Sequence, residues 1–140
     1  MRTVNMVRSK TAAFCVVMGI AAFSLVCTSP KPRELHRATS PDGTMDIVVA
    51  TYPAGATVST PYEVFIVRHG AHTTPDRVVL RTDKSDPPKA AWSSNNRVSI
   101  SCGGARVWQF RNFDTIGIGE GNFLYVGIKL DCGQNGYFAE

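Results

Sequence analysis

Short runs of alternating or β-branched residues follow one another along most of the chain after residue 40. Residues 97–102, RVSISC, alternate polar and apolar side chains strictly, and residues 44–52, TMDIVVATY, are β-branched and apolar. Both patterns are typical of β-strands, and no window after Ser29 keeps a helical spacing of apolar positions over twelve residues. The pattern therefore predicts strands at residues 44–52, 61–68, 76–82, 97–102, 105–111 and 123–131.

Turn residues separate these runs. Residues 40–43, SPDG, have the composition of a tight turn that leads into a strand. The Gly103-Gly104 pair predicts a hairpin between the two runs on either side of it. GIGEG at residues 117–121 predicts a bulged turn, and DKSDPPK at residues 83–89 predicts a loop because consecutive prolines cannot donate ladder hydrogen bonds.

Together these elements predict an all-β fold. With 140 residues the chain is long enough for one domain. We expect a small antiparallel β-sandwich or a partly open barrel of six to eight short strands, after an N-terminal hydrophobic signal or anchor helix. The expected organisation is a signal peptide or membrane anchor at 1–27, a polar tether at 28–39 and a single β-domain at 40–140.

The N-terminal segment has the pattern of an export signal. Residues 1–10 carry three basic side chains and no acid, and residues 11–30 carry no charge. A basic region followed by an apolar region is typical of a secretory signal. Three outcomes stay open: lipidation at Cys27, cleavage without lipid, and retention as an uncleaved anchor. The residues before Cys27 make a poor lipidation motif, because Val26 takes the place of a small residue.

Net charge argues against nucleic acid as a partner. The whole chain has 15 Lys and Arg against 11 Asp and Glu, but three of the basic residues and none of the acidic ones precede residue 28. The remainder is close to neutral, whereas nucleic-acid binding needs a basic surface on the folded domain.

Two cysteines remain after the N-terminal segment. Cys102 and Cys132 each end a strand-like run beside glycine. In an exported domain such a pair is read as one disulfide bond. Zinc binding is disfavoured because the chain has no CxxC motif and no Cys/His ligand spacing.

Two loops are the candidate sites. The loop at residues 55–60 is rich in hydroxyls and has a flexible glycine, so it is a candidate binding loop through Gly55, Thr57, Ser59 and Thr60. The loop at residues 69–76 holds His69, His72 and Asp76, and Glu63 lies on the strand before it. Without a third ligand nearby we expect no metal there, and no motif indicates a cofactor or a catalytic residue.

The aromatic residues are expected mainly in the sandwich core. Trp108 alternates with Val107 and is the one expected to face outward. The aromatic positions concerned are Trp92, Trp108, Phe110, Phe113, Phe123 and Tyr125.

Part of the chain resembles a known group of proteins. Residues 40–67, SPDGTMDIVVATYPAGATVSTPYEVFIV, are similar to the opening of a family of small exported bacterial proteins of unknown function. Trp92 to Ser101 and the Arg106-Val107 pair resemble later segments of that family, so the resemblance spans residues 39–131. Where the resemblance implies a cysteine before Gly-Ala-Thr, this chain has Ala54. The resemblance implies export and a β-fold, and it brings no activity.

Two functions are therefore expected as alternatives. The first is a non-catalytic exported envelope protein, periplasmic or membrane-tethered, whose β-domain binds an envelope protein or a membrane surface by an edge strand or an aromatic face. The second is a small envelope hydrolase that uses the loop at 69–76. The hydrolase requires that this loop and the loop at 55–60 converge on one pocket with a carboxylate beside an imidazole. The oligomeric state stays open.

Overall fold

The computed structural model describes residues 31–53, 55, 58–133 and 137–138. The predicted signal or anchor at residues 1–27 and its Cys27 lie outside the described residues. Among the residues described, no helix has the length and hydropathy needed to cross a membrane.

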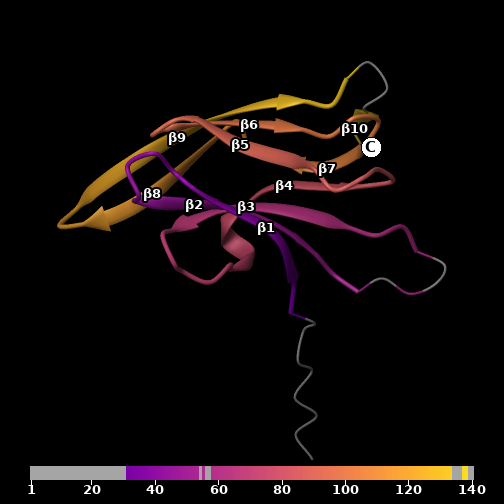
Figure 1. Cartoon of the computed structure of the whole chain (residues 1–140), viewed down its shortest axis with the longest axis horizontal. Helices are drawn as coiled ribbons and strands as arrows, with labels where there is room; N and C mark the ends of the chain where they lie inside the picture. The colour runs from indigo at the N-terminus through magenta and orange to yellow at the C-terminus, as the bar shows by residue number, and fades with distance from the viewer. Residues whose placement is uncertain (1–30, 54, 56–57, 134–136, 139–140) are drawn as a thin grey trace, which may run out of the picture.

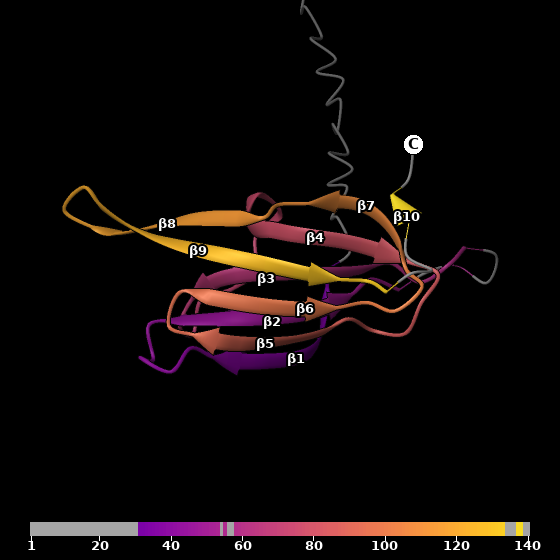
Figure 2. The same ribbon diagram turned by 90° about the horizontal axis from the view of Figure 1, so that it is seen from above.

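Two sheets packed face to face form a β-sandwich (Figures 1 and 2). The first, sheet A, has the order β1-β2-β3-β4-β7-β10, and the second, sheet B, has the order β5-β6-β9-β8. The bounds are β1 Arg33–Thr39, β2 Met45–Thr51, β3 Tyr62–Arg68, a short 3-10 helix η1 Pro75–Arg77, β4 Val78–Asp83, β5 Lys89–Ser94, β6 Arg97–Ser101, β7 Arg106–Phe110, β8 Phe113–Gly119, β9 Asn122–Asp131 and β10 Tyr137–Phe138. The all-β prediction is confirmed, and the two sheets do not close into a barrel.

All six predicted strands are present, with ends within two residues of the expected ones. Residues 33–39, expected in the polar tether, instead form β1, which pairs antiparallel with β2. β5, β8 and β10 are further strands that the pattern does not predict, so the described residues form ten strands rather than the expected six to eight. The sheets are not purely antiparallel, because β6 pairs with β9 and β7 with β10 in parallel.

The predicted hairpin across Gly103-Gly104 is wrong. β6 belongs to sheet B, where it pairs with β5 and β9, and β7 belongs to sheet A, where it pairs with β4 and β10. The glycine pair is therefore the point at which the chain crosses from one sheet to the other. A glycine turn reverses the chain locally, but it does not decide which strand supplies the hydrogen bonds.

Two other turns behave as predicted. In SPDG, the Gly43 amide donates to the Ser40 carbonyl at 2.9 Å, and Gly43 has a φ of 73°, which suits glycine. The Ser40 hydroxyl accepts from the Met45 amide at 3.0 Å and so starts β2. Between β8 and β9 the register shifts between Gly117 and Gly119, which is the expected bulge.

The predicted disulfide joins Cys102 to Cys132. The parallel register of β6 and β9 ends with Ser101 opposite Asp131, so the next residues of both strands face each other. The Cys102 amide donates to the Asp131 carbonyl at 3.0 Å and extends the ladder to the bridge. The disulfide thus locks a pairing between strands that lie far apart in sequence.

The main core lies between the sheets, and sheet A has a second apolar cluster on its outer face. Met45, Ile47 and Val49 of β2 point into the main core. The alternate residues Val48 and Ala50 join a cluster on the other face, which also contains Phe65, Val67 and Val78. This is why every residue of β2 is buried. The loop after β3 covers this second cluster, with Ala71 packed against it.

Candidate binding face

Asp46 fastens the loop after β3 to the outer face of sheet A. Its carboxylate is fully buried and lies on the same face of β2 as Val48. It accepts hydrogen bonds from Arg37 Nη1 at 2.7 Å and Thr39 Oγ1 at 2.8 Å, both on β1. From the loop it meets His69 Nδ1 and the Gly70 amide, both at 2.9 Å. One carboxylate therefore ties three segments together.

Burial and hydrogen bonding act on Asp46 in opposite directions. Removal from water favours the neutral acid, but the hydrogen bonds from His69, Gly70 and Arg37 favour the carboxylate. The hydrogen bonds prevail and hold the pKa of Asp46 far below its usual value. Asp46 is thus a structural anion, and the sequence analysis missed it although it is the one acid within the apolar run at 44–52.

The structure places the candidate residues of the 69–76 loop in separate surroundings. His72 lines a hollow of about 360 Å³ together with Glu34 of β1. The pair of His69 and Asp46 resembles two members of a catalytic triad, but in the described part of the chain no hydroxyl bonds to the second ring nitrogen of His69. Asp76 lies beside Arg77, with 3.4 Å between Oδ2 and Nε. Glu63 pairs with Arg81 at 2.5 Å. No described group of three His, Cys, Asp or Glu residues is placed to hold a metal.

The candidate loop at 55–60 lies at the opposite end of β3. It precedes Tyr62, whereas the loop at 69–76 follows Arg68, so the length of the strand separates them. Ser59 donates to Asp83 at 2.6 Å, and Asp83 also accepts from Arg106 Nε at 2.8 Å. Thr57 lies outside the described residues. The convergence that the hydrolase alternative requires is absent from the described loops.

We expect Asp83 to contribute to acid lability. The guanidinium of Arg106, opposed by burial and aided by Ser59, lowers the pKa of Asp83 to about 2. A carboxyl whose pKa falls on folding stabilises the fold above its unfolded pKa of about 4, and this contribution is lost as the pH falls towards 2. On acidification, the free energy of unfolding of Asp83→Asn should therefore fall by about 2 kcal/mol less than that of the unmodified protein.

Urea unfolding at about pH 6 and about pH 2.5 measures this difference. Asp86→Asn is the matched control, because Asp86 is exposed in the next loop. An equal loss of stability in Asp83→Asn and the unmodified protein would contradict the assignment.

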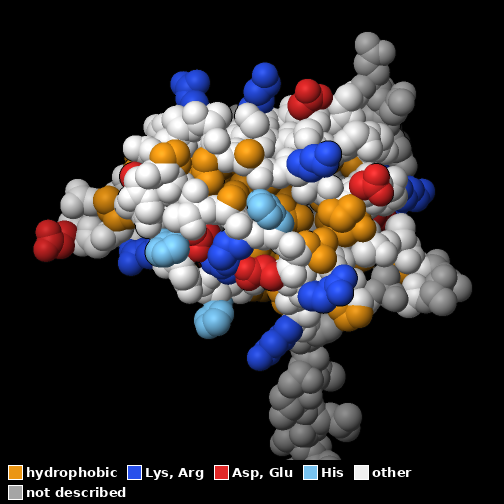
Figure 3. Space-filling view, viewed as in Figure 1, with side chains coloured by type: hydrophobic (Ala, Val, Ile, Leu, Met, Phe, Trp, Pro, Cys, Tyr) orange, Lys and Arg blue, Asp and Glu red, His pale blue; other side chains and the backbone are white. Residues whose placement is uncertain are grey.

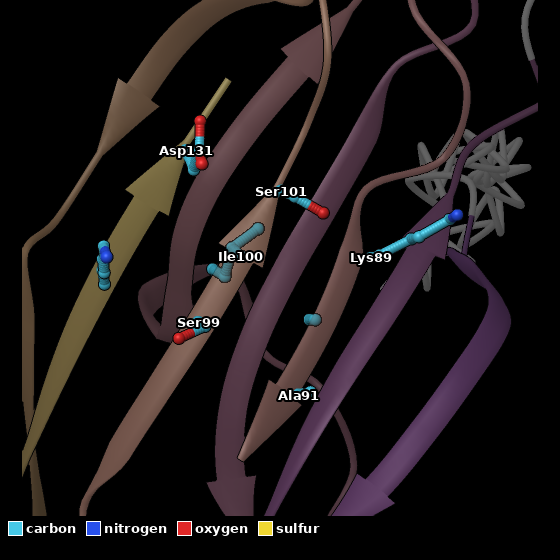
Figure 4. Close-up of a pocket in the computed structure, with 8 residues that line it drawn as sticks. Lys89, Ala91, Ser99, Ile100, Ser101 and Asp131 are labelled. Atoms are coloured by element: carbon cyan, nitrogen blue, oxygen red, sulfur yellow. The ribbon is translucent and has the colours of Figure 1, made fainter. Parts of the chain in front are cut away.

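The outer face of sheet B carries a shallow trough with a floor of small side chains. One hollow of about 310 Å³ is lined by Ala91, Ser99 and Ser101, among others. In Figure 4, Ser99 and Ser101 lie along β6, between Lys89 on β5 and Asp131 on β9. A second hollow of about 400 Å³ shares Ser99 and continues the trough along the sheet. We call this surface the sheet B trough and define it by Lys89, Ala91, Arg97, Ser99, Ser101, Gly127 and Lys129.

The trough carries free polar and positive groups. Lys89, Arg97 and Lys129 form no ion pair with any described residue. Asp131 is the one carboxylate lining either hollow, and it accepts from the Gly133 amide at 3.1 Å. Along the upper margin of the molecule in Figure 3, above β9 and β6, basic side chains stand with an acidic side chain next to them. The Ser99 and Ser101 hydroxyls have no hydrogen-bond partner among the described residues.

Three exposed aromatic side chains continue the trough at the β8–β9 hairpin, which projects beyond the rest of sheet B (Figure 2). Phe113, Phe123 and Tyr125, which we call the aromatic cluster, are 59%, 58% and 64% exposed. The expectation that they lie in the core is wrong for these three, because Asp114, Ile116 and Val126 take the inward positions. Trp108 faces outward as expected, and Trp92 and Phe110 pack against the core.

Glycines shape the junction between cluster and trough. Phe123 lies opposite Gly117, and a Cβ at Gly117 would be in ordinary van der Waals contact with its ring, 3.8 Å from Cε1. Gly127 pairs with Phe113 on one side and Arg97 on the other. The absence of side chains at these positions leaves the aromatic rings and the trough continuous.

Two arginines occupy backbone carbonyls on the edge of sheet B beside the aromatic cluster. β8 is an edge strand, and Arg77 Nη1 donates to the Thr115 carbonyl at 2.8 Å. The Arg68 guanidinium donates to the Gly117 carbonyl in the same way. Both carbonyls point away from β9, so an incoming strand would have to displace two charged donors. A ligand on this side therefore meets side chains rather than backbone.

No protein-family model, curated protein or solved structure matches this chain. The described fold defines the chain as a disulfide-bonded β-sandwich with an exposed sheet face.

Proposed function

We propose that the protein is a non-catalytic, exported protein of the cell envelope whose β-sandwich binds another envelope component through the outer face of sheet B. The uncharged segment at residues 11–30 favours export, with residence in the periplasm or on a membrane. The Cys102–Cys132 disulfide is compatible with that location. Lipidation at Cys27 belongs to the same proposal as one of the three outcomes for the N-terminal segment.

The aromatic cluster is the observation that carries this proposal. Three rings, each more than half exposed, stand together on one face, and burying them against a partner releases apolar surface from water. Tyrosine and other aromatic residues supply much of the affinity at binding surfaces. The two predicted loops lie at opposite ends of β3, so the hydrolase alternative has less support than the binding face.

Binding to isolated envelope fractions tests the proposal. The full chain is mixed with membrane vesicles and with detergent-washed cell-wall material from its own cells, and the bound fraction is measured after sedimentation. Phe123→Ser combined with Tyr125→Ser should weaken binding to one fraction about tenfold or more.

Trp108→Ser is the matched control, because Trp108 is an exposed aromatic residue on sheet A, 53% exposed. It should bind as the unmodified protein does. If the double variant binds both fractions as strongly as the unmodified protein, the aromatic cluster is not the binding surface.

A further inference from the structure

We infer that the outer face of sheet B recognises an extended anionic sugar chain, with the aromatic cluster stacking on sugar rings and the sheet B trough holding the charged groups. This inference rests on the proposed function and names the class of its ligand. Three features of this face support the inference: its charge, the hydrogen bonding of its backbone, and its length.

The basic side chains on the outer face of sheet B favour an anionic ligand. Lys89, Arg97 and Lys129 belong to three neighbouring strands, and the register places Lys129 beside Ser99 and Arg97 beside Gly127. Each basic group lacks an internal partner in the described structure, so a ligand carboxylate or phosphate would supply the first one. An anionic ligand therefore complements this face.

The backbone of the face disfavours a peptide strand. β6 lies between β5 and β9, and β9 pairs with β8 as far as Gly127 and with β6 from Gly127 onward, so amides and carbonyls along this stretch belong to the sheet ladders. At the β8 edge, Arg68 and Arg77 occupy two outward carbonyls. A peptide that binds by adding a strand needs such free groups. The outward side chains of the face are mainly hydroxyls, cations and aromatic rings, beside the one carboxylate of Asp131. They match the hydroxyls, acidic groups and C–H faces of sugars.

The length of the surface indicates a polymer rather than a single sugar. Phe123 and Lys129 lie six residues apart on the outward face of β9, which corresponds to about 20 Å along an extended strand. Phe123 and Tyr125 lie at one end and Lys89 and Lys129 at the other, with Gly127 between them and Phe113 and Arg97 on either side of Gly127. A ligand that uses both ends must therefore be a chain of several units.

Affinity electrophoresis of the full chain in a polyoxyethylene detergent tests the inference with three polymers cast in the gel. Polygalacturonate has acidic sugar rings, dextran has neutral sugar rings, and polyglutamate has acidic groups without rings. Polygalacturonate should retard the protein, the other two should retard it far less, and salt at about 1 M should abolish the effect. Phe123→Ser with Tyr125→Ser should reduce retardation by polygalacturonate.

Charge variants make the test specific to the trough. Lys89→Gln with Lys129→Gln should weaken binding to polygalacturonate about fivefold to thirtyfold, because two exposed charge contacts are lost. Lys31→Gln with Arg33→Gln removes two exposed charges at the start of sheet A and should bind as the unmodified protein does. Thermal melts establish that all variants remain folded.

Each other result overturns the inference. Equal retardation by polyglutamate means that charge alone attracts an acidic protein or peptide. Equal retardation by dextran means that the ligand is a neutral glycan. Equal loss in the two charge variants means that the attraction is diffuse. If no polymer retards the protein while binding to envelope fractions still depends on Phe123 and Tyr125, the ligand class is wrong and the proposed function stands.

Discussion

Asp46→Asn should lower the free energy of unfolding by about 3 kcal/mol, because one amide replaces a buried carboxylate that accepts four hydrogen bonds. The asparagine side chain can accept hydrogen bonds only through its carbonyl oxygen. Its NH₂ group would face groups that are themselves donors, so those donors would lose their acceptor. Arg37 remains fully charged, keeps its ion pair with Glu34 and loses the ion pair with Asp46. Urea unfolding at neutral pH measures the loss, and hydrogen exchange at Gly70 should speed up as the loop after β3 loosens.

Two further variants serve as comparisons for Asp46→Asn. Asp86→Asn removes an exposed aspartate and should change stability by less than about 0.5 kcal/mol. His69→Ala removes one of the four donors, and since the His69 side chain is 59% exposed it should cost about 1 kcal/mol. If Asp46→Asn is as stable as Asp86→Asn, Asp46 does not hold the loop in place.

Replacing Cys102 and Cys132 together with alanine should lower the free energy of unfolding by about 3–4 kcal/mol. The two cysteines are 30 residues apart in sequence, and freeing a loop of this length restores that much conformational freedom to the unfolded chain on the chain-entropy account. The pairing of β6 with β9 should be destabilised most, because its ladder ends at the bridge. Differential scanning calorimetry under oxidising conditions measures the fall in Tm.

Reduction supplies the control for the disulfide. With excess reductant, the unmodified protein should melt close to the double variant, since both then lack the bridge. A double variant that melts at the temperature of the oxidised, unmodified protein would rule out a stabilising disulfide.

The strands that the sequence predicted are those with a burial pattern of their own. β2, β3, β6 and β9 alternate or are β-branched, because their side chains face a core on one side or on both. β1 was missed because it is an edge strand with mostly exposed, charged residues, RELHRAT. β5 and β8 were missed because alanine, serine and glycine give little strand signal.

The candidate site was predicted less well than the fold. Both loops chosen for their polar residues make structural hydrogen bonds. His69 bonds to Asp46, and Ser59 donates to Asp83. The exposed face was missed because Phe123 and Tyr125 look like core residues in any linear reading. Alternation assigns a residue to one side of a strand, but it does not say whether that side is covered.

The sequence by itself determined the all-β class, six of the strands, the SPDG turn and the disulfide pair, because these depend on local periodicity, on local turn chemistry or on there being only two candidate cysteines. Tertiary structure alone decided the strand order, the parallel pairing of β6 with β9 and the crossing at Gly103-Gly104. It also decided which apolar faces meet water. The loop held by Asp46 covers the outer face of sheet A, while the aromatic cluster on sheet B stays exposed, and such a difference arises from contacts between segments far apart in the chain.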